Sequence, residues 1–234
     1  MKLYVNGDSH TAGAEAVNSC AFAEDDGNLR YLGRLPHPDN LAVSWGKLLA
    51  DTLKCGFHCN AESASSNTRI VRTTRDWIAQ NPRAVPETLF IIQWSTWERQ
   101  EWLIDGTYYQ VNASGVDSVP ASHQRAYKEF IINIDYWQVK QAAHAMVWDF
   151  HKELESLGAR HIFFNADMAF NDIRPYADWG VSYVEPYSHE MTYSKWLKNN
   201  GFETVSPKSY HFGKAAHSAW SRFMLQYIID NRLI

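Results

Sequence analysis

Hydrophobic and polar residues of this 234-residue chain follow two alternating patterns. Short, nearly continuous apolar runs are typical of strands buried in a parallel sheet, whereas apolar residues recurring every three or four positions are typical of a helix face. The predicted strands span residues 2–6, 55–60, 88–94, 160–165 and 203–205. The predicted helices span residues 41–53, 70–78, 127–157 with one break, and 216–228.

This order of elements predicts the fold class. Strands joined through helices favour a mostly parallel sheet with helices on both faces. We therefore expect an α/β protein with a three-layer, flavodoxin-like fold and a five-stranded sheet. The length suits a single domain over residues 1–234, and no linker-like segment divides it. Asp105-Gly106, between two runs rich in β-branched and aromatic residues, predicts an aromatic hairpin inserted at about residues 100–120.

Charge and composition narrow the choice of partners. The formal net charge is −4 and the basic residues are scattered, which argues against nucleic acid or an anionic membrane surface. No apolar run is long enough to span a bilayer, and the first residues lack the features of a signal peptide. Cys55 and Cys59 fall in one predicted strand, roughly 13 Å apart, too far for a disulfide. Together these features predict a cytoplasmic protein.

A candidate nucleophile follows the first predicted strand, in the sequence Gly7-Asp8-Ser9. Open α/β sheets bind ligands beyond the carboxyl ends of their strands, where the Ser9 hydroxyl is expected. Acyl transfer by a serine also needs a base and donors for the oxyanion. The chain has no Gly-x-Ser-x-Gly sequence, which excludes the nucleophile elbow of the α/β-hydrolases. It has no glycine-rich phosphate loop and no metal-ligand spacing, so no cofactor and no metal are expected.

Four short segments, in order along the chain, resemble the sequence blocks of the SGNH (GDSL-like) hydrolase family, in particular its shortened phage and bacterial members. Gly7-Asp8-Ser9 resembles the first block, and residues 63–70 are similar to the second. Residues 93–96 occupy the third block, and Tyr210-His211-Phe212-Gly213 resembles the last. The resemblance extends from end to end of the chain and implies the fold and the activity of that family.

The resemblance also implies roles for single residues. Ser9 would be the nucleophile and His211 the base that takes its proton. The oxyanion would be held by the amide of Ser9 and by that of Ala64 or Ser65, in the second block. The hydroxyl of Ser95, in the third block, would add a further donor.

Three positions depart from the family pattern. The second-block glycine is replaced by Ala64 or Ser65, and the third-block asparagine by Ser95 or Thr96. The family acid commonly lies three residues before the histidine, where this chain has Lys208. Two arrangements are therefore open: a Ser9–His211 dyad that works alone, or a carboxylate such as Glu203 that orients the imidazole from elsewhere.

The expected function is that of a serine esterase acting on small acyl esters. Ten tryptophans are in the chain, and large rings either fill the core or stack on sugars, so carbohydrate O-acetyl groups are the substrate we favour. The altered blocks leave a second hypothesis open, that of an SGNH-like binding module that is catalytically weak or inactive. An acyltransferase using the same residues is a third.

Overall fold

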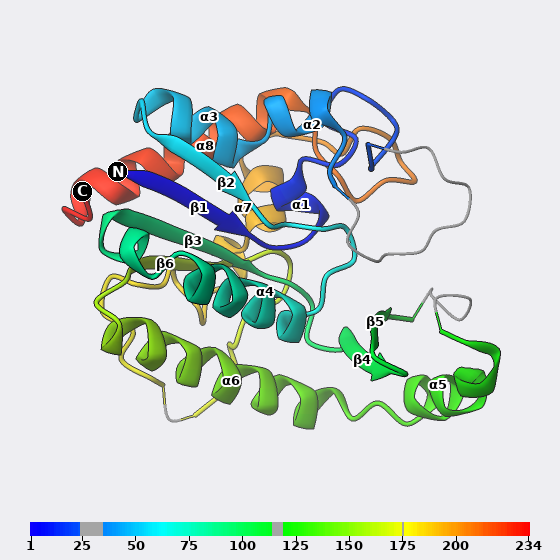
Figure 1. Cartoon of the computed structure of the whole chain (residues 1–234). Helices are drawn as coiled ribbons and strands as arrows, with labels where there is room; N and C mark the ends of the chain where they lie inside the picture. Colours follow the sequence, from blue (N-terminus) through cyan, green and yellow to red (C-terminus); the bar gives the residue numbers. More distant parts are fainter. Residues whose placement is uncertain (24–34, 114–118, 175) are drawn as a thin grey trace.

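The computed structural model describes residues 1–23, 35–113, 119–174 and 176–234 (Figure 1). Its centre is a parallel sheet of four strands in the order β2-β1-β3-β6. All seven residues of β3 are buried, as expected for a central strand covered on both faces. The strands of this sheet are β1 (Lys2–Asn6), β2 (Gly56–Cys59), β3 (Thr88–Trp94) and β6 (Arg160–Asn165).

Helices cover both faces of the sheet, so the molecule has three layers (Figure 1). Alternate strand residues point to opposite faces and pack against different helices. One face carries α4 (Asn67–Gln80) and α6 (Tyr136–Ser156). The opposite face carries α3 (Trp45–Thr52), α7 (Tyr193–Asn199) and α8 (Lys214–Asp230).

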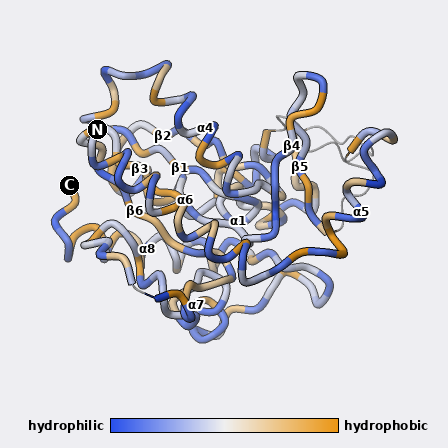
Figure 2. Tube along the Cα trace, turned by 90° about the horizontal axis from the view of Figure 1, so that it is seen from below, coloured by the Kyte–Doolittle hydropathy of each residue, from blue (hydrophilic) through white to orange (hydrophobic). Residues whose placement is uncertain are grey.

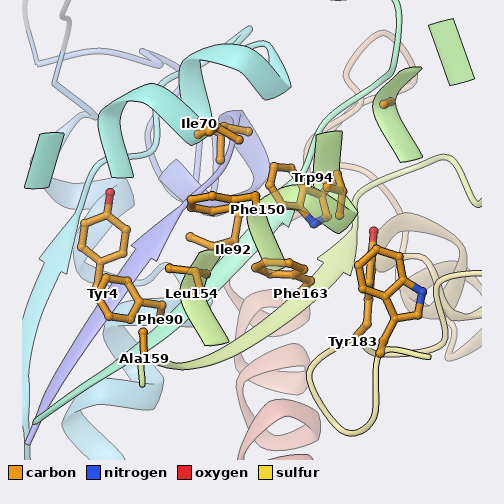
Figure 3. Close-up of a cluster of buried hydrophobic side chains, with 14 of the residues drawn as sticks. Tyr4, Ile70, Phe90, Ile92, Trp94, Phe150, Leu154, Ala159, Phe163 and Tyr183 are labelled. Atoms are coloured by element: carbon orange, nitrogen blue, oxygen red, sulfur yellow. The ribbon is translucent and has the colours of Figure 1, made fainter. Parts of the chain in front are cut away.

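The core between the sheet and helices α4 and α6 is rich in aromatic rings (Figure 3). Phe90 and Phe163 of the sheet meet Phe150 of α6, and the Trp94 ring lies edge-on to Phe163 with centroids 5.0 Å apart. Edge-to-face contacts of this kind are favourable beyond the area they bury. Much of the aromatic content therefore serves the core.

The prediction of a fifth strand in the sheet is wrong. Residues 203–205 do not join the sheet; Thr204 instead forms an isolated antiparallel bridge with Phe212. The sheet edge beside β6 is extended by a single parallel bridge between Phe163 and Tyr183. Thr204 and Phe212 are close along the chain, so their contact costs less loop-closure entropy than pairing with β6 at the edge of the sheet would.

Helix boundaries follow their capping residues. The segment predicted as one helix over 41–53 is two, α2 (Pro38–Ala42) and α3, because the Ser44 hydroxyl caps α3 by accepting from the Lys47 amide. The break predicted within 127–157 is confirmed, since Asp135 caps α6. The remaining elements are α1 (Ser9–Ala12), α5 (Gln124–Ile132), and the 3₁₀ turns η1 (Pro82–Glu87), η3 (Ala121–His123) and η4 (His189–Met191).

A hairpin is present over residues 100–111, with β4 (Gln100–Ile104) paired antiparallel to β5 (Thr107–Val111), and residues 114–118 of the predicted insertion lie outside the described residues. Asp105 and Gly106 have φ of 49° and 78°, the left-handed values that a two-residue hairpin turn requires. The hairpin and α5 lie together at one end of the molecule, away from both chain termini (Figure 2). No helix among the described residues has the length and apolar composition needed to cross a bilayer.

Candidate active site

Ser9 lies directly beyond the carboxyl end of β1, as the first residue of α1. The Asp8 carboxylate caps this short helix by accepting from the His10 amide at 3.0 Å, and Gly13 ends it in the left-handed conformation. Ser9 is 8% exposed and lines a cavity of about 880 Å³. The nucleophile candidate is therefore held on a turn rather than inside a long helix.

The cavity lies where the carboxyl ends of the parallel strands meet, the usual ligand position in open α/β sheets. Ser9 and His211 both line it, although they are far apart in sequence. Its main walls come from the segments after β1 (Ser9, His10), β2 (Ser63, Ala64), β3 (Thr96, Glu98, Arg99) and β6 (Asp167, Met168), and from Tyr210 and His211 before α8.

A carboxylate is bound to His211. The Nδ1 atom of His211 lies 2.9 Å from Oε2 of Glu15, so an Nδ1–H group donates to Glu15 and Nε2 is left as the basic nitrogen. The hydroxyl of Ser209 donates to the same Glu15 oxygen and accepts from the His211 amide at 3.0 Å. Glu15 thus fixes both the tautomer and the orientation of the imidazole.

Burial and charge set the protonation of this pair. Burial, reinforced by the nearby His10, lowers the pKa of His211 below its usual value, and Glu15 only partly opposes this. Burial alone would raise the pKa of Glu15, but its hydrogen bonds with Ser209 and His211 outweigh that effect and lower it. At neutral pH His211 is an unprotonated base beside an ionised Glu15.

Glu203, the one carboxylate that the sequence analysis names as a candidate for this position, does not bond to His211. Glu203 is exposed and lines a neighbouring cavity. Glu15 lies in the segment after α1 with φ of 61°. Its one signal in the sequence is its closeness to Ser9, whereas the family pattern directs attention to the C-terminal block.

The loop that contains Ala64 and Ser65 leaves one of their two backbone amides free and holds the other in a hydrogen bond. Ala64 lines the cavity with φ of 64°, the left-handed conformation that glycine adopts without strain. The Ser65 amide donates to the carbonyl of Glu62 at 3.1 Å. In the described parts of the chain, the amides of Ala64 and Ser9 have no hydrogen-bond acceptor. Of the two residues, Ala64 is therefore the one that offers a free amide to the cavity.

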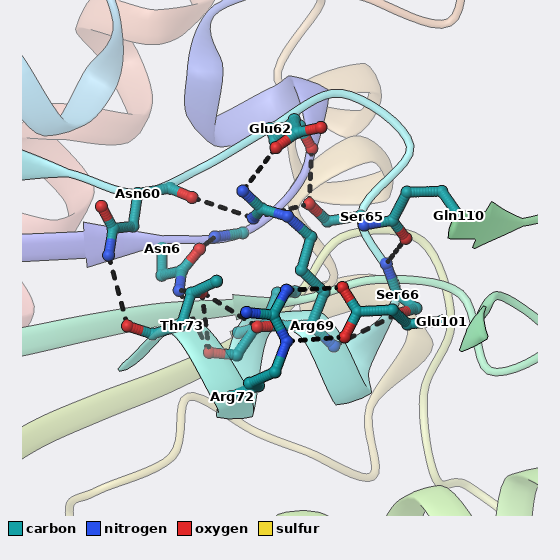
Figure 4. A network of polar contacts seen from close by, with 12 residues as sticks. Asn6, Asn60, Glu62, Ser65, Ser66, Arg69, Arg72, Thr73, Glu101 and Gln110 are labelled. Carbon is teal, nitrogen blue, oxygen red and sulfur yellow. Dashed lines mark hydrogen bonds and ion pairs between the residues drawn. The ribbon is translucent and has the colours of Figure 1, made fainter. Parts of the chain in front are cut away.

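Arg69 holds this loop in place (Figure 4). Its guanidinium donates to the carbonyl of Asn60 at 3.0 Å, to the hydroxyl of Ser65 at 3.2 Å and to the carboxylate of Glu62. The side chain of Asn67 accepts from the Ser95 amide at 2.8 Å and connects the loop to the end of β3. Neither Arg69 nor Asn67 lines the Ser9 cavity, so their role is to position the backbone.

The Ser95 hydroxyl is directed away from the cavity. It donates to Oδ2 of Asp8 at 2.9 Å and accepts from Arg99 at 2.7 Å. Its neighbour Thr96 does line the cavity, and its buried hydroxyl has no partner in the part of the chain that the structure describes. The donor expected from Ser95 is thus occupied, and Thr96 has the free hydroxyl.

Comparison with known proteins gives a family. Residues 35–223 match the model described as "Family of unknown function (DUF6071)". The chain belongs to this family. No curated protein is significantly similar to it. A solved structure that resembles it is that of "a putative lipolytic protein of G-D-S-L family from Desulfitobacterium hafniense DCB-2", with 14% identity, a TM-score of 0.40, and coverage of 100% of this chain and 99% of that one.

A second imidazole in this DUF6071 protein lies beside the first. The ring of His10 packs edge-on to that of His211 with centroids 5.6 Å apart, and its Nε2 lies 3.6 Å from Oδ2 of Asp167. Burial would lower the pKa of His10, but Asp167 and Asp8 outweigh it and raise the pKa. The two carboxylates thus shift the protonation equilibrium of His10 toward its charged form.

A third histidine, His217, belongs to the core. It is buried between α8 and α3, where its Nδ1 accepts from the Trp45 amide at 3.2 Å. Burial lowers the pKa of His217 to about 3, so it is a neutral core residue. Among the described residues, no group of three histidine, cysteine or acidic side chains is arranged to hold a metal ion.

Proposed function

We propose that this DUF6071 protein is an SGNH-type serine esterase in which Ser9 is the nucleophile, His211 the base and Glu15 the residue that positions the base. The observation that carries the proposal is that His211, which bonds to Glu15, lines the same cavity as Ser9. A nucleophile, a base and a group that orients the base are the elements of nucleophilic catalysis by serine.

In the proposed reaction, Nε2 of His211 takes the proton of the Ser9 hydroxyl as the oxygen attacks the ester carbonyl. The tetrahedral intermediate collapses when His211 returns that proton to the leaving alcohol, which leaves an acyl group on Ser9. Water, deprotonated by His211, then attacks this acyl group, and His211 passes that proton to the Ser9 oxygen as the carboxylic acid is released. Glu15 keeps its charge throughout and stabilises the imidazolium in both steps.

The oxyanion would be held by the amides of Ser9 and Ala64. The family asparagine is absent and the Ser95 hydroxyl is occupied, so the unpartnered hydroxyl of Thr96 is the third donor we propose. Loss of one oxyanion donor costs about 10²–10³ in rate. We therefore expect slower turnover than a site with the full asparagine and glycine set would give.

Polar atoms on the cavity wall favour a substrate with a hydroxylated alcohol part. The hydroxyls of Ser63 and Thr96 and Oε2 of Glu98 are buried there without partners among the described residues. A buried polar atom that lacks a partner is costly, and a ligand with its own hydroxyl groups would supply the missing bonds. Carbohydrate O-acetyl esters fit this requirement.

One observation favours the second hypothesis, a binding module with little or no activity. Across the described residues, no hydrogen bond joins the Ser9 hydroxyl to His211. Catalytic hydrogen bonds in ligand-free enzymes are often long and tighten only with substrate. Whether Ser9 is activated therefore decides between the two functions.

Labelling with a fluorophosphonate, followed by intact mass, tests activation of Ser9. We expect one adduct on the wild type, none on Ser9→Ala, and a much slower reaction of His211→Ala. Ser63→Ala is the matched control because this serine lines the same cavity and should label as the wild type does. A folded wild type without an adduct would exclude the esterase and favour the binding module.

A further inference from the structure

A second cavity, of about 610 Å³, adjoins the Ser9 cavity. Asp167 and Tyr210 line both, so the two spaces are neighbours with these side chains between them. The second cavity lies between α7 and the segment 201–210 that precedes His211. The two cavities together offer more room than a small acyl ester requires.

Tyr210 stands at the junction of the two cavities and is 83% exposed. Its exposure leaves the face of the ring free, although it directly precedes the candidate base His211. Aromatic rings of this kind offer a large apolar face together with a polar hydroxyl. Such a ring at the junction suits a ligand that passes from one cavity into the other.

The chemistry of the second cavity favours a neutral, hydroxylated ligand. Hydroxyl groups predominate among its polar side chains, and the charged ones include both signs, Lys198 as well as Asp167 and Glu203. The hydroxyls of Ser206 and Tyr210 are exposed and make no hydrogen bond among the described residues, so they can bond to hydroxyl groups of a ligand, which a long acyl chain does not offer. An anion would meet two carboxylates. The hydroxyl-bearing residues are Ser194, Thr204, Ser206, Ser209 and Tyr210.

We propose that the second cavity is a subsite for the continuation of an oligosaccharide, with Tyr210 stacking on the chain where it leaves the Ser9 cavity. The sugar unit that carries the ester would lie beside Ser9, and its neighbours would extend past Tyr210 toward Lys198. This rests on the proposed esterase function for the reacting group, and binding of the chain itself can be measured without turnover.

Binding to Ser9→Ala protein tests the subsite directly. Calorimetry would use partially O-acetylated gluco-, xylo- and N-acetylglucosamine oligomers of increasing length, from the monosaccharide upward. We expect affinity for at least one series to rise tenfold or more on lengthening, because the longer ligands reach the second cavity. Tyr210→Ala, in the same background, should remove most of this gain.

Two further variants make the result specific. Ser206→Trp places a large ring in the second cavity from an exposed position and should also abolish the gain. Tyr136→Ala removes a tyrosine that is 61% exposed on α6, outside both cavities, and this variant should keep the gain in affinity. Affinity that does not change with length in any series, or a gain that survives both Tyr210→Ala and Ser206→Trp, would overturn the subsite.

Failure of the esterase and failure of the subsite are distinguishable. Hydrolysis of p-nitrophenyl acetate that is lost in Ser9→Ala reports on the catalytic residues and involves no sugar. A length-dependent affinity without this hydrolysis would support the subsite and remove the esterase. Hydrolysis without a length-dependent affinity would support the esterase and exclude the subsite.

Discussion

The imidazole of His211 is joined to the carboxylate of Glu15 by a 2.9 Å contact between Nδ1 and Oε2. The two residues come from opposite ends of the chain, and Ser209 bonds to both of them. The position three residues before His211, where the acid of SGNH hydrolases commonly lies, is Lys208. The carboxylate comes instead from Glu15, near the N-terminus.

Glu15→Gln should lower kcat for p-nitrophenyl acetate by about 10²-fold, because an uncharged amide stabilises the developing imidazolium less. Glu15 raises the pKa of His211, so its neutralisation should also move the acid limb of the pH–rate profile to lower pH. A rate loss without this movement would indicate a purely structural role. Glu129→Gln, on the exposed face of α5, is the matched control, and a rate that depended on Glu203 instead would contradict the assignment.

Ala64→Gly should stabilise the protein. A left-handed conformation costs a non-glycine residue about 1–2 kcal/mol, and the entropy of an added glycine offsets part of this, so a gain of about 0.5–1 kcal/mol is expected. The amide is retained, and labelling of Ser9 should therefore persist. Urea unfolding measures the gain, and Ala64→Val, which brings a β-branched side chain to the same backbone, should lose stability. A loss of stability in Ala64→Gly would show that the left-handed backbone is not strained.

Arg99→Met should destabilise the fold by about 2–4 kcal/mol, because it removes a charged donor from a buried carboxylate. Asp8 is 1% exposed and accepts from Arg99 at 2.9 Å. Chemical denaturation at neutral pH measures the loss. Arg125→Met, whose ion pair with Glu129 is exposed, should change stability by no more than about 0.5 kcal/mol.

The loss of stability caused by Arg99→Met should also depend on pH. Burial raises the pKa of Asp8, but His10 and Arg99 outweigh it and hold the pKa below its usual value. This stabilisation is complete above the unfolded-state pKa of about 3.9 and is lost as the pH falls through the lower folded-state value. The difference between wild type and Arg99→Met should therefore narrow below about pH 4. A constant difference would rule out the ion pair as its source.

Acid should destabilise the protein through a buried histidine pair on the far side of the sheet from α8. His161 donates from Nδ1 to the Ala159 carbonyl, so its Nε2 accepts from Nδ1 of His151 at 2.8 Å. Burial lowers the pKa of His161 to about 4. The unfolded chain binds this proton near pH 6.5, so stability should fall as the pH is lowered from about 6.5 toward 4.

His161→Gln tests this dependence, since the glutamine oxygen can still accept from His151. The variant should be less stable at pH 7, but its stability should fall less steeply between about pH 6.5 and 4. His189→Gln, at an exposed position, should keep the slope of the wild type. Equal slopes in His161→Gln and the wild type would show that other groups cause the acid sensitivity.

Local patterns in the sequence were enough to predict most elements of the fold. The apolar run of β3, the Asp105-Gly106 turn and the break before α6 depend on neighbouring residues, and all three are present. The same local signals placed Ser9 after the first strand, and parallel strands direct their carboxyl ends to one edge. The cavity that Ser9 and His211 share follows from this topology.

Tertiary structure decided which side chains pair within that site. From the sequence, Glu203 is a candidate orienting acid and Ser95 a candidate oxyanion donor. Glu203 instead lines the second cavity, and the hydroxyl of Ser95 is bonded to Asp8. Glu15 reaches His211 through a left-handed backbone and the packing of α1 against the segment before α8. Hydrogen bonds between residues far apart in sequence depend on where side chains meet in space, and neither periodicity nor spacing along the chain contains that information.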